Sequence, residues 1–587
     1  MSNYFIEPAS IIVGETQLIE KYEAHVDVND DLRRMVEAAR QRVLLANLLV
    51  EYRQLKIEHD VIDYSDQVRL AAQAAMDSPA MQQALREEFQ VVLLDEYQDT
   101  SIAQKILLLN LFGDGHPVMA VGDPCQGIYR WRGAEITNMD AFCSEFTKSD
   151  GSSATQLKLT LNRRSVQKIL SAANHISSDL RKLHPIIGEL VSTNSDANAG
   201  SVSAGVHLKH DDELQWICQN VIEHGKNRVL QDIAILTRTN SPIARIIAEL
   251  EKHGVPIQVA DAQALFELPE VREVICYLQV LADPAENVAL ARILAGPRWR
   301  IGQRDLAAIG KFAQDLSGFR DDESDRPLDE QLDRIVASND GSERVSLLDA
   351  IEQVDLIADR LSPEAVQRVT QLANELRGLR KYVFEPVIDL VSRIIRVTGL
   401  GVEALVQKTE YGVTHYDRLS MLLDLAGSFK DLDGQSTLHA FVAYISDSDR
   451  YNMSIESELP SNTNAVTVMT IHKAKGLEYP VVLLPHWTND VFPYTKAKGD
   501  TYWFSNPQNV PHTYIPSRLH DPITDLPGVA GNFKNDLLAH KEIVKQEMLQ
   551  DEMRLAYVAI TRAGEHVLAS SSWWGPTQKK PRGASEF

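Results

Sequence analysis

Two adjacent carboxylates follow a short apolar run near residue 95. The run Val91–Leu94 leads directly into Asp95 and Glu96. A strand that delivers two acids at its C-terminal end can offer one carboxylate to Mg²⁺, which prefers hard oxygen ligands, and one to polarise an attacking water. The same dipeptide also occurs at solvated strand ends that cap the next helix, so both interpretations stay open for this segment alone.

A second apolar run, Val118–Val121, is followed by a segment that combines aromatic and basic side chains. This segment, Gly122–Ala134, contains Tyr129, Trp131 and Arg132. Rings and guanidinium groups in such proximity suit stacking on single-stranded bases and contact with their phosphates, and each stacked base contributes roughly 1–3 kcal/mol. The alternative is an aromatic core cluster whose arginines extend to solvent.

Three further segments carry candidate phosphate ligands, namely Leu159–Ser165, Val468–Tyr479 and Arg554–Ala563. Arginine suits the stabilisation of charge on a transferring phosphoryl group, because its planar guanidinium stays protonated and donates paired hydrogen bonds. Arg164 and Arg562 are therefore candidates for this role. Taken singly, either arginine is more often a surface ion-pair partner, and the lysines of the middle segment could be solvated residues of a strand-to-helix connection.

The elements that must position these residues follow an α/β pattern. Short apolar runs that end in polar functional residues are typical of buried parallel strands, so Val91–Leu94 and Val118–Val121 are expected to be such strands. Further strands are predicted at Ile233–Leu236, Val466–Met469 and Val481–Leu484. The sequence therefore predicts an α/β fold with parallel sheets.

Helical spacing of apolar residues predicts helices in four stretches, at about 32–76, 242–252, 284–457 and 544–563. Gly254 is expected to cap the second of these. The stretch 190–204, rich in Ser, Asn, Ala and Gly, is expected to be a connecting loop. The simplest architecture is an α/β layer interrupted by a helical insertion.

Length and composition restrict the class of protein. A chain of 587 residues is expected to form several domains, and its 44% apolar and 24% charged residues are ordinary for a globular protein. The net charge of −23 excludes a diffuse basic surface for polyanions. A local channel of Arg and Lys could still bind nucleic acid, because salt screens distant charges over about 8 Å.

Cysteine usage and hydropathy indicate an intracellular, cytoplasmic protein. The four cysteines form no C-x-x-C pair, which argues against a disulfide framework or a zinc ribbon. No run approaches the roughly 20 apolar residues that would span a bilayer, and we expect no membrane partner.

Taken in order, the five segments resemble motifs II to VI of the superfamily 1A DNA helicases of the UvrD, PcrA and Rep type. The resemblance runs from Asp63–Asp66, which is similar to an acid-rich turn upstream of motif II, to Ala563. The phrase Gly296–Gly302 and the arginine pair Arg163–Arg164 are most similar to actinobacterial UvrD-like and AdnB-like helicase-nuclease subunits. The resemblance implies RecA-like P-loop NTPase domains with helical 1B and 2B insertions.

The same resemblance implies a division of the chain into six parts. These are a remnant of helical domain 1B (1–78), the C-terminal part of RecA-like domain 1A (79–170), the first part of RecA-like domain 2A (171–283), helical domain 2B (284–457), the second part of domain 2A (458–575) and a tail or linker (576–587).

The resemblance also assigns roles at a site for ATP and Mg²⁺. Asp95 would hold Mg²⁺, Glu96 would activate water and Gln126 would sense the γ-phosphate. Arg164 and Arg562 would reach that phosphate from motifs IV and VI.

Further roles follow for residues around the nucleotide and the DNA. The implied nucleotide-binding residues are Arg163, Gly476 and Glu478, the last on the ribose. The implied DNA-binding residues are Tyr129, Trp131, Arg132 and His472, the last linking DNA contact to the nucleotide cleft.

The function implied is that of an ATP-dependent 3′-to-5′ helicase and translocase, acting on single-stranded DNA and on single-strand/double-strand junctions in repair or recombination. A partner subunit of a helicase-nuclease complex would be compatible with this activity.

The sequence departs from the family pattern most strongly at the phosphate-binding loop. No G-x-x-x-x-G-K-[ST] occurs anywhere in the chain, so we expect an N-terminally truncated protein that hydrolyses ATP poorly or not at all. Arg163 replaces the usual Tyr of motif IV. In motif III, Pro124 and Cys125 stand where the family is acidic, which leaves Asp123 as the remaining acid.

Two alternatives belong to other functional classes. One is a non-hydrolysing DNA-binding or assembly subunit of a helicase-nuclease complex, which the missing loop favours. The other is a metal-dependent nuclease that uses Asp95 and Glu96. The flanking arginines fit phosphoryl transfer from a nucleotide better than they fit a nuclease.

Overall fold

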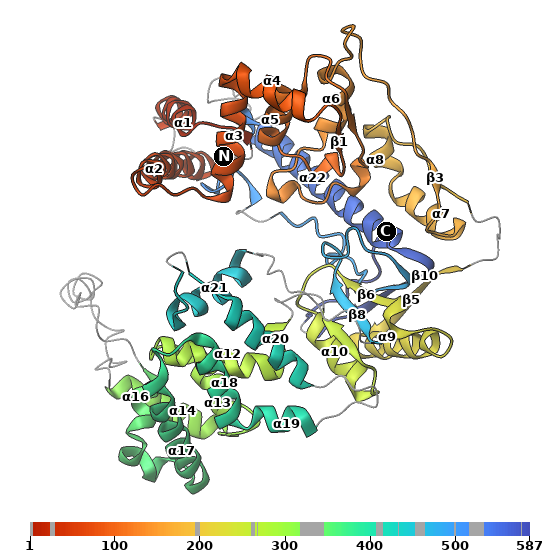
Figure 1. The fold of residues 1–587 in the computed structure, drawn as a ribbon. Helices are drawn as coiled ribbons and strands as arrows, with labels where there is room; N and C mark the ends of the chain where they lie inside the picture. The colour runs from red at the N-terminus through yellow and green to blue at the C-terminus, as the bar shows by residue number, and fades with distance from the viewer. Residues whose placement is uncertain are drawn as a thin grey trace. The chain divides into compact units, whose positions relative to one another are not determined.

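A computed structural model of the protein describes residues 4–23, 30–193, 200–259, 265–266, 268–316, 346–406, 415–431, 434–451, 464–497, 501–515, 533–576 and 578–587 (Figure 1). The chain divides into two compact units. The first consists of Met1–His224, Asp232–Arg238 and Ala474–Phe587, and the second of Gly225–Gln231 and Thr239–Lys473.

The first unit contains both helices and strands. Its helices are α1 (Pro8–Tyr22), α2 (Asp30–Glu58), α3 (Tyr64–Asp77), α4 (Pro79–Glu88), α5 (Ile102–Phe112), α6 (Thr137–Glu145), α7 (Gln167–Ile176), α8 (Ser178–Leu183), α9 (His210–Gly225) and α22 (Phe533–Thr561). Its strands are β1 (Val92–Leu94), β2 (Val118–Ala120), β3 (Leu161–Asn162), β4 (Val191–Ser192), β5 (Ser201–Lys209), β6 (Ile233–Thr237), β9 (Tyr479–Leu484) and β10 (Ala563–Trp574).

Four strands of this unit are parallel neighbours in the order β5, β10, β9, β6. In the register, Val567 of β10 lies opposite Val202 of β5 on one side and Val482 of β9 on the other. The predicted strands at Ile233–Leu236 and Val481–Leu484 are confirmed, and both runs are fully buried. Their continuous apolar character is what a strand covered on both faces requires.

The expectation of a loop over 190–204 is wrong at both of its ends. β4 occupies Val191–Ser192 and β5 begins at Ser201, while residues 194–199 lie outside the described residues. β5 has no apolar run, and only its pairing with β10 makes it a strand, so its own sequence carried little signal.

Strands β1 and β2 are where expected, but the expectation that they are buried is wrong. They pair in parallel, and Leu93 and Met119 at their centres are 69% and 53% exposed. The opposite face packs against α3 and α5 through a cluster that includes Ala75 and Phe112. Because only one face is covered, alternate apolar side chains of this two-stranded sheet reach solvent.

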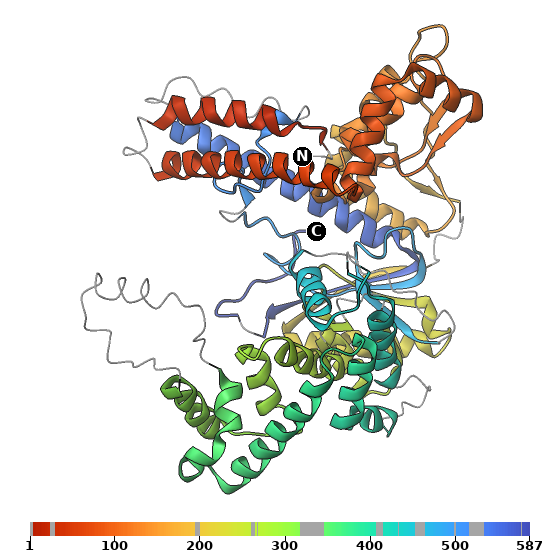
Figure 2. The ribbon, with the colours of Figure 1, turned by 60° about the vertical axis from the view of Figure 1, so that its left-hand side comes forward.

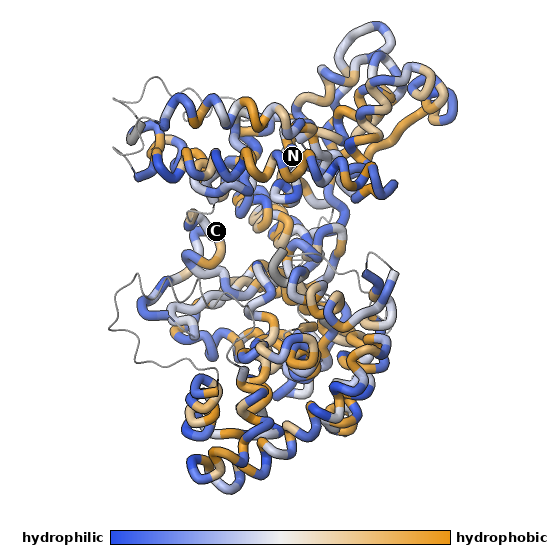
Figure 3. Tube along the Cα trace, turned by 90° about the vertical axis from the view of Figure 1, so that its left-hand side faces the viewer, coloured by the Kyte–Doolittle hydropathy of each residue, from blue (hydrophilic) through white to orange (hydrophobic). Residues whose placement is uncertain are grey.

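Helices α1 and α2 lie side by side, as Figures 1 and 2 both show. A buried ion pair joins them, since Arg42 donates from Nε to Glu15 Oε2 (2.9 Å) and from Nη1 to the backbone oxygen of Trp503 (2.6 Å). Hydrophilic and hydrophobic residues alternate along these N-terminal helices (Figure 3). The predicted helix within 32–76 is confirmed by α2 and α3.

One apolar stripe of α2 nevertheless faces solvent. Leu44, Leu48 and Tyr52 are exposed, whereas the buried side of the helix is formed by residues such as Met35 and Ala46. Helical spacing of apolar residues therefore predicted the helix correctly but did not identify its buried face.

Lys56 ties the end of α2 to the start of α3. Its Nζ contacts the carboxylates of Asp63 (2.7 Å) and Asp66, which also form a reciprocal capping box at the N-terminus of α3. Burial raises the pKa of both carboxyls, but hydrogen bonds from Lys56 and from backbone N–H groups outweigh it and hold each pKa below its ordinary value.

We expect Lys56→Met to remove a pH-dependent part of stability. A lowered folded-state pKa stabilises the fold above the ordinary carboxyl pKa of about 4 and loses that contribution as pH falls through the lowered value. The deficit of the variant, measured by urea unfolding, should therefore be large at pH 7 and shrink toward pH 3. Lys182→Met is the control, because the ion pair between Lys182 and Asp179 is exposed. A deficit that does not change with pH would contradict this account.

The second unit is largely helical. Its helices are α10 (Ile243–Lys252), α12 (Pro269–Ala282), α13 (Asn287–Ala295), α14 (Gln303–Leu316), α16 (Leu347–Glu352), α17 (Pro363–Leu379), α18 (Val387–Thr398), α19 (Leu400–Val406), α20 (His415–Ser428) and α21 (Leu438–Tyr451). Its strands β7 (Ile257–Val259) and β8 (Val466–Thr470) pair in parallel.

The predicted helical block over 284–457 is confirmed for its described residues, which contain no strand. The predicted boundary at 457/458 falls in 452–463, outside the described residues. The helix to Lys252 is confirmed, and Gly254 follows its end with a positive φ of 71°, as a C-terminal cap requires. The strand predicted at Val466–Met469 is confirmed as β8.

A buried polar network fixes the phrase Gly296–Gly302 within this unit. Trp299 Nε1 donates to the hydroxyl of Tyr277 (3.1 Å), and that hydroxyl donates to Glu375 (2.8 Å). Arg298 completes the network with two hydrogen bonds to the same carboxylate (2.6 and 2.7 Å). The sequence phrase therefore joins helices α12 and α17.

Among the described residues, no helix combines the length and the hydropathy that crossing a bilayer would need.

Candidate functional site

The carboxylates of Asp95 and Glu96 lie in the first unit, directly after β1, and both side chains are exposed. Glu96 has a left-handed backbone with φ of 51°, and its N–H donates to Asp95 Oδ1 (2.9 Å). Gln98 Nε2 donates to Glu96 Oε2 (2.5 Å). A left-handed conformation is unusual for a residue other than glycine, so the turn after β1 carries a backbone cost at Glu96.

Lys475 connects this turn to motif III. Its Nζ lies 3.2 Å from Glu96 Oε2, contacts the carboxylate of Asp99, and donates to the backbone oxygen of Gln126 (2.9 Å). The side chain is 7% exposed. The interpretation of the lysines here as solvated is therefore wrong for Lys475, because three oxygens from two segments surround its ammonium group.

Asp123 organises the turn that carries Gln126. Its carboxylate accepts hydrogen bonds from the backbone N–H of Cys125 (2.9 Å), from Gln126 Nε2 (2.9 Å) and from the hydroxyl of Tyr557 on α22 (3.1 Å). The Pro124–Cys125 departure from the family pattern leaves this turn well formed, since Asp123 supplies the needed acceptor.

Arg562 reaches the same turn from the end of α22. Its Nη2 donates to Gln126 Oε1 (3.3 Å), and its Nη1 donates to the backbone oxygen of Leu477 (3.2 Å). The side chain is 3% exposed, and burial, with a further contribution from Arg164, lowers its pKa to about 10. The guanidinium is still protonated at neutral pH.

Arg164 lies next to this group. Its Nε donates to Glu478 Oε2 (2.5 Å), and its Nη1 donates to the backbone oxygen of Thr561 (3.3 Å). Its neighbour Arg163 is exposed, and Gly476 adopts a positive φ of 84° that favours glycine at this turn. Two arginines that repel each other are thus held close together, an arrangement that an anion such as phosphate would stabilise.

Aromatic and basic side chains adjoin the Lys475 network. The guanidinium of Arg132 lies 4.6 Å from the ring centre of Trp131 and 5.6 Å from that of Tyr129, while Lys475 Nζ lies 5.1 Å from the Tyr129 ring. Trp131 is 55% exposed. Arg130, in contrast, is paired with Glu547 of α22 (2.9 Å) and is not an exposed phosphate ligand.

His472 is not placed with these residues. It is half-buried in the turn after β8 and belongs to the second unit. Its predicted link between DNA and the nucleotide remains a prediction.

Contacts within the first unit therefore connect nine of the predicted site residues through one network of hydrogen bonds, ion pairs and cation–π contacts, namely Asp95, Glu96, Gln126, Tyr129, Trp131, Arg132, Arg164, Glu478 and Arg562. Sequence reasoning missed Lys475 and Tyr557 as members of it. Tyr557 had a usable signal, because Arg554, Tyr557 and Thr561 follow helical spacing along one face of α22. Lys475 had none, since lysines are common in such turns.

The donor set fits part of a site for Mg²⁺ and ATP. Asp95 offers the oxygen ligands that Mg²⁺ prefers, and Gln126, Arg164 and Arg562 supply the polar and cationic groups that suit a γ-phosphate. The sequence contains no phosphate-binding loop to hold the rest of the triphosphate.

Comparisons with known proteins identify the family that the chain matches. The model of the UvrD/REP helicase N-terminal domain matches residues 15–147, and that of the UvrD-like helicase C-terminal domain matches residues 157–572. The ATP-dependent DNA helicase UvrD1 of Mycobacterium tuberculosis is 27% identical over 98% of this chain and 65% of its own length. The ATP-dependent DNA helicase PcrA of Bacillus subtilis is 24% identical over 90% of this chain and 61% of its own length. The chain thus spans less than two-thirds of the length of these relatives.

Proposed function

Because the chain belongs to the UvrD-like helicase family, we propose that it acts on single-stranded DNA as the part of an ATP-dependent 3′-to-5′ helicase that activates water and senses the γ-phosphate. The observation that carries this proposal is the contact between Arg562 and Gln126, which lie 436 positions apart in the sequence. This contact joins motif VI to motif III. Lys475 in turn joins motif III to Glu96 of motif II.

Each residue has a chemical task in this proposal. Glu96 orients and polarises the attacking water, while Gln126 and Arg562 respond to charge on the γ-phosphate. Asp95 would hold Mg²⁺, which, when bound, neutralises charge on the phosphates. Arg164 adds a second guanidinium, and Glu478, which accepts from it, would bind the ribose.

Lys475 supplies a physical route between the DNA-facing residues and the water-activating acid. Its ammonium contacts Glu96 on one side and lies over the Tyr129 ring on the other. A strand that stacks on Trp131 and displaces Tyr129 would therefore change the position of Lys475, and with it the charge beside Glu96. In this proposal, bound DNA would thereby influence the acid that activates water.

A specific observation favours a second candidate function. The sequence lacks a G-x-x-x-x-G-K-[ST] loop, so the chain could be a non-hydrolysing DNA-binding or assembly subunit of a helicase-nuclease complex. Both functions use the same DNA surface. They differ in whether the chain turns over ATP.

The assignment of the DNA surface is tested with Trp131→Ala. We expect the affinity for a single-stranded oligonucleotide to fall about 5- to 150-fold, the equivalent of roughly 1–3 kcal/mol for a lost base stack. Fluorescence anisotropy at fixed salt measures it. The matched control is Trp573→Ala, which removes another half-exposed tryptophan from β10. Equal affinities for Trp131→Ala and the parent would exclude this surface.

A further inference from the structure

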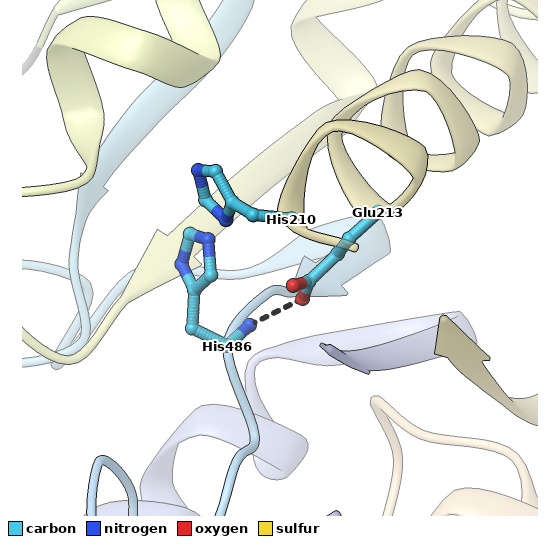
Figure 4. Close-up of side chains that lie close together, drawn as sticks. All are labelled: His210, Glu213 and His486. Atoms are coloured by element: carbon cyan, nitrogen blue, oxygen red, sulfur yellow. Dashed lines mark hydrogen bonds between the residues drawn. The ribbon is translucent and has the colours of Figure 1, made fainter. Parts of the chain in front are cut away.

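A second cluster of chemically reactive side chains lies at the other end of β9 from the site described above. Glu478 and the Arg562 contact adjoin the start of this strand, whereas His486 follows its end. Six residues of strand separate the two places, which corresponds to about 20 Å. The cluster consists of His210, Glu213 and His486 (Figure 4).

The ends of β5 and β9 and the start of α9 bring the three side chains together. β5 ends at Lys209 and α9 begins at His210, so His210 and Glu213 share one face of its first turn. His486 comes from the loop after β9 and has a left-handed backbone with φ of 62°, uncommon for a residue other than glycine. Its ring stacks on that of His210 with 5.0 Å between the ring centres and 24° between the planes.

Glu213 is the residue that makes this cluster more than a histidine pair. The side chain is fully buried, and its Oε1 accepts from the backbone N–H of His486 (2.8 Å) and from the Ser570 hydroxyl (2.9 Å). Among the described residues, its Oε2 has no hydrogen-bond partner. A buried carboxylate oxygen without a partner is costly, and a cation beside it would remove that cost.

The donor set and its spacing match a metal site. One ligand atom from each residue lies within 4.8 Å of the others. Ligands of a tetrahedral Zn²⁺ with bonds of about 2.0 Å are roughly 3.3 Å apart, a spacing that small side-chain rotations can reach from here. Two imidazoles and one carboxylate favour Zn²⁺ or a similar transition metal over Mg²⁺, which prefers an all-oxygen shell.

We propose that His210, Glu213 and His486 bind one divalent transition metal ion of the zinc class. The ion fastens the β5–α9 junction to the loop after β9, with a water molecule as the fourth ligand. This site is separate from the proposed helicase function, and neither depends on the other.

Zinc titration of the full chain after chelator treatment tests the site. The parent is expected to bind one more equivalent of Zn²⁺ than His210→Gln or His486→Gln. Loss of even an outer partner of a metal ligand weakens binding about 10- to 100-fold, so loss of a ligand should weaken it at least as much. Zn²⁺ should also raise the melting temperature of the parent but not of these variants, and Mg²⁺ should have no such effect on either.

The matched control is His224→Gln. His224 pairs with His566 at 4.9 Å between ring centres, and no third ligand group completes that pair among the described residues. This variant should bind zinc like the parent. All of these proteins carry the same four cysteines, so binding to thiols cancels in the comparison.

Equal zinc stoichiometry and affinity in the parent, His210→Gln and His486→Gln would overturn the proposal. If both variants failed to fold, the visible spectrum of the Co²⁺-loaded parent would decide. Bands from nitrogen and oxygen ligands would support the site. A thiolate charge-transfer band alone would place the metal on cysteines and overturn it.

Discussion

The purified chain should hydrolyse ATP no faster than the buffer background, even with saturating single-stranded DNA. The reason is the absent phosphate-binding loop, whose backbone N–H groups and lysine would otherwise hold the β- and γ-phosphates. The measurement is release of inorganic phosphate with and without an oligonucleotide. DNA-stimulated turnover well above background would contradict the expectation and would favour the helicase over the non-hydrolysing subunit.

Arg562→Ala decides whether any turnover that is observed comes from this site. An arginine that stabilises the charge of a transferring phosphoryl group contributes about 10³- to 10⁵-fold in rate, so the variant should lose the activity entirely. Arg562 also bonds to the backbone within the fold, and a thermal melt of the variant is the needed control. Turnover that survives in a folded Arg562→Ala chain would belong to a contaminant.

Lys475→Met is expected to destabilise the first unit by about 3–5 kcal/mol, because it leaves the partly buried carboxylate of Asp99 without its cation. Burial already raises the pKa of Asp99, and Lys475 opposes that rise. An acid with a raised folded-state pKa costs stability as pH rises above its ordinary value, so the deficit should be largest at neutral pH and smaller near pH 3.

Two further variants make this prediction specific. The double variant Lys475→Met/Asp99→Asn should recover much of the stability, because the partly buried unpaired charge is gone and Glu96, the other partner of Lys475, is exposed to solvent. Lys496→Met should change stability by less than about 1 kcal/mol, because Lys496 pairs with Asp490 at the surface. Urea unfolding at pH 7 measures all of them. A Lys475→Met chain as stable as the parent would show that the ion pair between Lys475 and Asp99 does not stabilise the fold.

Local sequence was sufficient where one segment determined its own structure. The apolar runs before Asp95 and after Tyr479 predicted strands, and the helical periodicity near Lys252 predicted both the helix and its glycine cap. It failed where structure depended on a distant partner. β5 is a strand through β10, and the burial of β1 depends on which elements cover its two faces rather than on its own residues.

Some residues of the candidate site could likewise be predicted from local sequence, and others could not. Residue types predicted Asp95 and Arg562 as candidates, and the resemblance of the ordered segments to a known family implied Gln126. Lys475 acquires its position only through oxygens contributed by other parts of the chain. The histidine–glutamate cluster is the extreme case, since Glu213 and His486 lie 273 positions apart in no recognisable pattern.

The cysteine of motif III gives the molecule an intrinsic reporter of motion. Cys125 is almost fully buried between Asp123 and Gln126, and burial raises the pKa of its thiol far above the ordinary value. Alkylating reagents attack the thiolate. The Cys125 thiol is therefore protected in the native turn and reacts only when the turn opens. The rate at which this thiol is modified therefore follows the opening of the turn that carries Gln126, without any attached label.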